Sequence, residues 1–147
     1  IYMLIPYKYT KIAHLSSLFI LLPDYALFKQ KEYFMVSLNI MCYILTNMHW
    51  SNLKKDGLIR EVDITVVLTN FIYSLYVAKK YTCYDLYYRN IIIIFCVFTI
   101  NSIIDSYTIY NGKKTHFHYI RTCYTHCLFC HIFQGLNSFY VTNYCNN

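Results

Sequence analysis

The chain has 147 residues, of which 57% are apolar, 20% aromatic and only 14% charged, with a formal net charge of +6. Soluble domains carry about 25% charged residues, so this composition argues against an ordinary water-soluble domain. Three glycines and two prolines also argue against the many turns of an all-β fold. The length favours a single domain covering residues 1–147.

Five apolar segments follow one another along the chain, at 12–28, 33–50, 63–78, 86–104 and 117–141. Buried strands usually stop at about eight residues, so these longer segments favour helices. Helices also satisfy their own backbone hydrogen bonds in lipid, and segment 33–50 is close to the roughly 20 residues needed to span a bilayer. Short polar connections make consecutive helices antiparallel neighbours. The sequence therefore predicts an all-α, multi-pass transmembrane bundle of about five helices, the first interrupted by Pro23.

Basic residues occur in small groups beside the apolar runs, as in Lys54–Lys55 and Lys79–Lys80. This pattern is typical of loops that flank a membrane and differs from a continuous basic groove, so we expect a lipid bilayer and no nucleic acid as partner.

Alternation of the five helices places two sets of basic residues on opposite sides of the membrane. Eight lie on the side of the N-terminus: Lys8, Lys11, Lys54, Lys55, Arg60, Lys113, Lys114 and Arg121. Five lie on the other side: Lys29, Lys31, Lys79, Lys80 and Arg89. This excess predicts that the side with eight is cytoplasmic.

Five of the seven cysteines lie inside apolar runs, where cysteine usually behaves as a small hydrophobic residue. Cys83 and Cys145 lie nearer to predicted loops and could pair with each other. A disulfide framework is the less favoured interpretation of the seven cysteines.

Ionisable groups at membrane depth suggest function. His49 lies at the end of the second segment, Asp63 at the start of the third, and His126 and His131 in the first half of the fifth. Antiparallel packing places these ends on the same side of the bilayer. We therefore expect the four side chains at similar depth.

This set has the chemistry of a catalytic zinc site, which uses three protein ligands and leaves a position for water. His49, Asp63 and a residue of the fifth segment could supply the ligands. His126 and His131 are five residues apart, about 140° around an ideal helix, so they could not both face one ion. Cys127 with His131, or His126 with Cys130, has the favoured spacing of four. A π-bulge could instead bring the two histidines together.

Structural roles remain open for the same residues. His49 could be an interfacial anchor, and Asp63 could cap the third helix because acidic residues favour helix N-termini. Cys123, Cys127 and Cys130 fall on one helix face and could form a small-residue packing stripe.

The order of "HLSSLFILLP", "YILTNMHW", "LIREVDITVVL" and "YTHCLFCHIFQGLNSFYV" resembles the CREST superfamily of membrane proteins, nearest to its myomaker-like branch. The superfamily also includes alkaline ceramidases, progestin/adiponectin receptors, hemolysin III and Per1 proteins. The resemblance implies a shortened version of a seven-helix bundle. The family motif has a serine four residues before a histidine, an aspartate in the next helix, and two histidines four apart in the last helix.

Transferred to this chain, the motif implies zinc ligands at His49, Asp63 and His131, with His126 or Cys127 completing the set. The family serine falls on Leu45, so Thr46 is the candidate for hydrogen bonding to a metal-bound water or oxyanion. The terminal pair is longer by one residue than in the family, and about two helices are missing before the last.

The resemblance and the polar set predict a zinc-dependent membrane hydrolase of a lipid amide or ester, with Thr46 and Asp63 in catalytic roles. The alternative is a non-catalytic multi-pass membrane protein, either a small subunit with a membrane-protein partner or a degenerate family member. A transporter or channel is a weaker third option. Because the sequence begins at Ile1, a fragment or a processed product is compatible with it.

Overall fold

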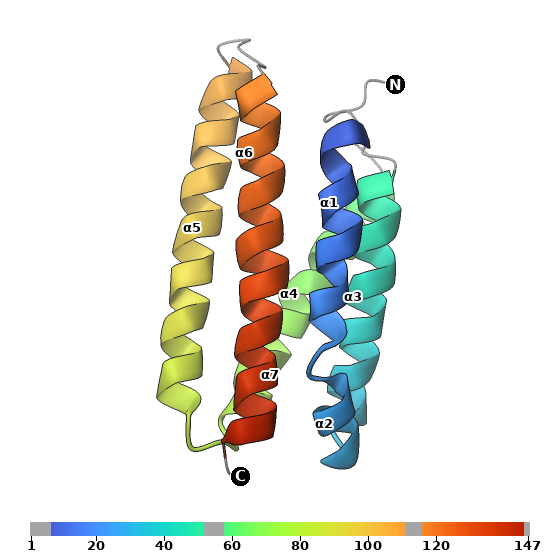
Figure 1. The fold of residues 1–147 in the computed structure, drawn as a ribbon, viewed down its shortest axis with the longest axis vertical. Coiled ribbons are helices and arrows are strands. Elements are labelled where there is room, and N and C mark those ends of the chain that lie inside the picture. The colour runs from blue at the N-terminus through green and yellow to red at the C-terminus, as the bar shows by residue number, and fades with distance from the viewer. Residues whose placement is uncertain (1–6, 52–57, 111–115, 146–147) are drawn as a thin grey trace.

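The computed structural model describes residues 7–51, 58–110 and 116–145. Within these residues the fold is all-α, with five helical rods that run roughly along the long axis of the molecule (Figure 1). The first rod contains α1 (Tyr7–Ser17), the 3-10 helix η1 (Leu18–Leu21) and α2 (Asp24–Lys29); then follow α3 (Tyr33–Ser51), α4 (Leu58–Ala78) and α5 (Tyr84–Tyr110); the last rod contains α6 (His116–His126), the π-helix η2 (Cys127–Phe133) and α7 (Gln134–Tyr144).

The predicted five-helix architecture is confirmed, and the helices are longer than the apolar segments that predict them. α4 begins at Leu58 rather than at residue 63, and α5 continues to Tyr110 rather than ending at 104. Hydropathy marks the part of a helix that suits lipid, whereas backbone hydrogen bonding continues into polar flanks.

The interruption predicted at Pro23 is also present. The α-helix tightens into η1 and turns before Pro23, which has no backbone N–H to continue the hydrogen-bond ladder. α2 then starts at Asp24, whose negative charge in the first turn complements the helix dipole. The chain reverses toward α3 through Lys31, which has a left-handed φ of 64°.

Three rods are long and apolar enough to cross a membrane, over Tyr9–Lys29, Glu61–Ala78 and Tyr84–Ile104. Many large apolar side chains on these rods are exposed, such as Leu15, Ile72 and Phe95. In lipid such side chains meet hydrocarbon, so their exposure costs no hydrophobic free energy. α3 and the α6–α7 rod pack lengthwise beside them (Figure 1). The chain is an integral, multi-pass α-helical membrane protein.

Packing divides into two hydrophobic clusters. The smaller one contains Ala13, Trp50, Cys123 and Cys127, where α1 and α3 meet the last rod. The larger cluster lies toward the end of the bundle that contains Cys145. It is centred on buried residues of α4, α5 and α7, including Ile94 and Val141.

A close backbone approach joins the first and last rods. Gly135 of α7 lies against η1, and a Cβ atom at this position would be 2.1 Å from the carbonyl oxygen of Phe19. Only a residue without a side chain lets the two rods cross at this distance. This crossing helps to set the position of η2 relative to α1.

Candidate functional site

The last rod changes its helical pitch at the predicted histidines. Residues Cys127–Phe133 form a π-helix between α6 and α7. In a π-helix the backbone hydrogen bonds connect residues five apart, so side chains five apart point in similar directions. The rings of His126 and His131 meet at a centroid distance of 4.8 Å with an interplanar angle of 84°. The π-bulge therefore brings together two side chains that a regular helix would separate.

This geometry predicts an unusual tolerance of the last rod to deletion. Removing Leu128, which is 52% exposed in η2, would convert the π-bulge to a regular helix and leave the His pair four apart on one face. We expect this variant to fold and to keep the Cys83–Cys145 disulfide, because the side chains of α7 keep their orientation around the helix axis.

The matched control removes Leu136, which is 46% exposed in α7. This deletion rotates every later residue by about 100° and should prevent the disulfide. Mobility on non-reducing gels and thermal stability in detergent are the measurements. Equal damage from both deletions would contradict the assignment of η2 as an insertion in a regular helix.

His131 contacts a buried hydroxyl group of the first rod. Its Nδ1 lies 2.7 Å from the Oγ of Ser16, across 115 residues of sequence, and both side chains are 3% exposed. Ser16 Oγ also donates a hydrogen bond to the backbone carbonyl of Ala13 at 3.3 Å. A buried hydroxyl paired with an imidazole has the arrangement of a nucleophile and its base.

His49 lies near this pair on the side of α3. The indole ring of Trp50 contacts the rings of His49 and His126, with centroid distances of 5.7 Å and 5.1 Å. The ring of Phe98 in α5 also lies near His126, with a centroid distance of 6.4 Å. His49 and His126, two of the histidines predicted to share one depth, therefore contact the ring of Trp50, and His131 contacts His126.

Asp63 has a different partner. Thr46 of α3 donates a hydrogen bond to its Oδ1 at 3.4 Å, which joins α3 to α4. The interpretation of Asp63 as a helix cap is wrong, because α4 begins five residues earlier at Leu58. Thr46, predicted to bind a metal-bound water or an oxyanion, is used in this helix contact.

A zinc site needs three protein ligands around one point. Within residues 7–51, 58–110 and 116–145, no three His, Cys, Asp or Glu side chains lie where they could hold a metal ion. Cys127 is a free thiol buried in the smaller hydrophobic cluster. The residues as arranged do not fit the predicted zinc site, and zinc stays a prediction from the resemblance.

Two polar residues at this site were not identified from the sequence. The first is Ser16, which lies at the contact of α1 with η2. The second is Asn47 of α3, whose amide group hydrogen-bonds with Ser17 and with the imidazole of His14 at the contact of α3 with α1. The available signal was a pair of adjacent serines, Ser16–Ser17, in the middle of an apolar run. Small polar residues within membrane helices often hydrogen-bond between helices.

No protein-family model, curated protein or solved structure matches this chain. The resemblance to the CREST superfamily therefore stays a prediction from short motifs.

Proposed function

We propose that this protein is a membrane-embedded hydrolase of a lipid ester or amide, in which Ser16 is the nucleophile and His131 is the general base. The observation that carries the proposal is the 2.7 Å contact between Ser16 Oγ and His131 Nδ1. Two residues so far apart in sequence meet in the interior of the bundle, where an imidazole next to a hydroxyl activates it for attack.

The surroundings suit this role. Ser16 donates to His131 only if Nδ1 is unprotonated, which leaves the proton of the neutral ring on Nε2. The edge-to-face contact with His126 restricts the rotation of the His131 ring. A base whose ring orientation is fixed loses less entropy when the reaction begins.

The reaction would proceed in two steps. In the first, Ser16 Oγ attacks the carbonyl carbon and passes its proton to His131 Nδ1, which then protonates the departing alcohol or amine as the acyl-serine forms. In the second, His131 takes a proton from water as that water attacks the acyl group, and returns it to Ser16 Oγ as the carboxylic acid leaves. Both residues end in their starting forms.

A lipid substrate is favoured by what surrounds the pair. Leu15, next to Ser16 in sequence, and Leu128, three residues before His131, are exposed on rods that face hydrocarbon. An acyl chain could therefore approach laterally from the bilayer. The resemblance to CREST proteins implies the same substrate class and also zinc, but the described residues supply no third ligand and no step of this proposal uses a metal.

The η2 geometry concerns the spacing of the terminal histidines in the proposed motif. In the family motif the terminal histidines are four apart on a regular helix, and in this chain they are five apart across a π-helix. A π-bulge accommodates one added residue while keeping both side chains on one face.

A serine-directed alkyl fluorophosphonate tests the proposal on the full chain in lipid nanodiscs. We expect covalent labelling of the wild type, no labelling of Ser16→Ala, and a decrease of about 10²-fold or more in His131→Gln. Ser17→Ala is the matched control, because Ser17 is also buried, adjacent in the helix, and bonded to the His14 carbonyl rather than to His131. Labelling of Ser16→Ala at the wild-type rate would refute the role of Ser16.

The second candidate is a non-catalytic multi-pass membrane protein. It is favoured by the way the polar side chains are used, since pairs such as Thr46–Asp63, Asn90–Asn137 and Arg121–Asn101 join neighbouring helices by hydrogen bonds. Such pairs stabilise helix association in lipid without any chemistry. A folded wild type that takes up no probe would favour this candidate.

A further inference from the structure

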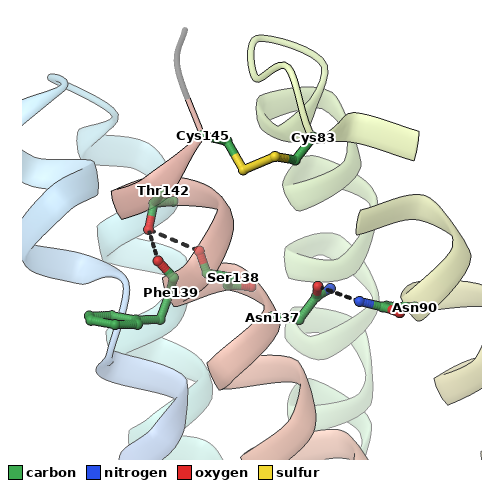
Figure 2. Close-up of a disulfide and its surroundings, with 7 residues drawn as sticks. All are labelled: Cys83, Asn90, Asn137, Ser138, Phe139, Thr142 and Cys145. Atoms are coloured by element: carbon green, nitrogen blue, oxygen red, sulfur yellow. Dashed lines mark hydrogen bonds between the residues drawn. A yellow bond between two sulfur atoms is a disulfide. The ribbon is translucent and has the colours of Figure 1, made fainter. Parts of the chain in front are cut away.

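The covalent link between Cys83 and Cys145 closes the last two rods into a ring. Cys83 immediately precedes α5, and Cys145 immediately follows α7, so their sulfur atoms join the ends of the α5–α7 hairpin that the chain itself does not connect (Figure 2). The two Cα atoms lie 5.8 Å apart. The hairpin is thereby held at both of its ends.

Other contacts tie the same end of the molecule. Lys80 forms an ion pair with Glu32, Tyr81 donates a hydrogen bond to Gln30, and Gln30 donates to the backbone carbonyl of Thr142. Burial raises the pKa of Tyr81 further above its usual value, and the hydroxyl of a tyrosine is a proton donor at neutral pH with or without this shift. The α2–α3 turn, the α4–α5 turn and the end of α7 form one linked surface.

The sequence assigns most of the basic residues to the opposite end. The N-terminal ends of α1 and α6 and the C-terminal ends of α3 and α5 lie at this end (Figure 1), and the alternation of the helices assigns eight of the thirteen Lys and Arg residues to it. Lys54, Lys55, Lys113 and Lys114 lie outside the described residues, and their side follows from the helix ends that flank them. An excess of Lys and Arg in short loops marks the cytoplasmic side.

We propose that the end with Cys83–Cys145 faces an oxidising compartment and that the lysine-rich end faces the cytoplasm. The inference does not rest on the proposed hydrolase activity. It joins two independent observations, because disulfides persist in the secretory lumen, the periplasm and outside the cell but not in the cytosol, and charge bias alone gives the same orientation.

The disulfide forms by exchange with a disulfide of a thiol oxidoreductase in that compartment. The thiolate of one cysteine attacks the donor disulfide and forms a mixed disulfide, and the second cysteine displaces the donor as its thiolate. Two electrons pass to the donor, which leaves as a dithiol, and two protons are released from Cys83 and Cys145 and taken up by the donor sulfurs. The five other cysteines stay as thiols, with Cys42, Cys123 and Cys127 buried among the helices.

Thiol counting tests the covalent part of the inference. Full-length protein made in sealed microsomes is denatured without reductant and alkylated with maleimide-polyethylene glycol. We expect five modified thiols before reduction and seven after it. Cys83→Ser should expose all of its six remaining thiols without reduction. Cys96→Ser, which removes a free thiol on α5, should keep the disulfide and serve as the control. Seven reactive thiols in the unreduced wild type would refute the disulfide.

Acceptor tags test the orientation. The sequence contains no Asn-x-Ser or Asn-x-Thr, so it has no natural glycosylation acceptor that could interfere. A flexible tag carrying Asn-Ser-Thr is added after Asn147 in one protein and before Ile1 in another. The odd number of rods places these ends on opposite sides of the membrane. We expect endoglycosidase-sensitive glycosylation of the C-terminal tag alone, and glycosylation of the N-terminal tag instead would reverse the assignment.

Discussion

Gly135→Ala is expected to destabilise the bundle strongly, with a loss of about 3 kcal/mol or more in the free energy of unfolding. The added Cβ would lie 2.1 Å from the Phe19 carbonyl oxygen and 2.7 Å from its carbon. Both are backbone atoms of η1, so they cannot move aside as a flexible side chain would. The rods must separate, which also pulls Ser16 away from His131.

The sign of this effect is informative. In an exposed helix, Gly→Ala stabilises by about 1 kcal/mol because alanine has the higher helix propensity. The close crossing reverses that gain. The measurement is thermal unfolding of Gly135→Ala in detergent. The control is Leu136→Ala, a substitution at an exposed neighbouring position. A melting temperature of Gly135→Ala at or above that of the wild type would contradict the crossing.

Asn39→Leu should produce the second large loss. Asn39 is buried in α3, where its amide nitrogen donates to Asp24 at 2.6 Å and its amide oxygen accepts from Asn70 at 2.7 Å. One side chain thus joins α2, α3 and α4. Leucine has a similar volume but leaves the Asp24 carboxylate and the Asn70 amide without this partner, and an unsatisfied buried polar group costs about 1–3 kcal/mol.

Asn70→Leu is the matched comparison, since it removes only one of the two hydrogen bonds. We expect it to cost about half as much as Asn39→Leu, or roughly 1 kcal/mol, the usual range for an interhelical hydrogen bond in membranes. Unfolding by titration with a denaturing detergent would compare the two variants. Equal losses would mean that the Asp24 contact contributes nothing.

The architecture could be predicted because membrane helices have strong sequence signals. Apolar length predicted the five rods, and Pro23 predicted the break in the first rod. The loop positions of Cys83 and Cys145 left their pairing open, and the structure shows that these two cysteines are bonded. The spacing of His126 and His131 left a π-bulge as one alternative beside the pairs with a spacing of four, and the structure contains the π-bulge.

The candidate site could be predicted only in part, since sequence fixes the depth of a residue better than its rotation about the helix axis. His49, His126 and His131 share a neighbourhood, as their depth suggested. Asp63 instead accepts a hydrogen bond from Thr46. A rotation of α4 by a fraction of a turn decides whether Asp63 faces Thr46 or the histidines. The Ser16–His131 contact depends on packing between the first and last rods, which no local pattern encodes.

The ring formed by α5, α6 and α7 has a consequence for biosynthesis. Cys145 follows the last rod, so it reaches its partner only after every preceding segment has been synthesised and threaded through the bilayer. A chain stalled with its final hairpin half inserted keeps both sulfurs reduced. We therefore expect the oxidation state of Cys83 and Cys145 to report whether the hairpin from α5 to α7 has been fully inserted.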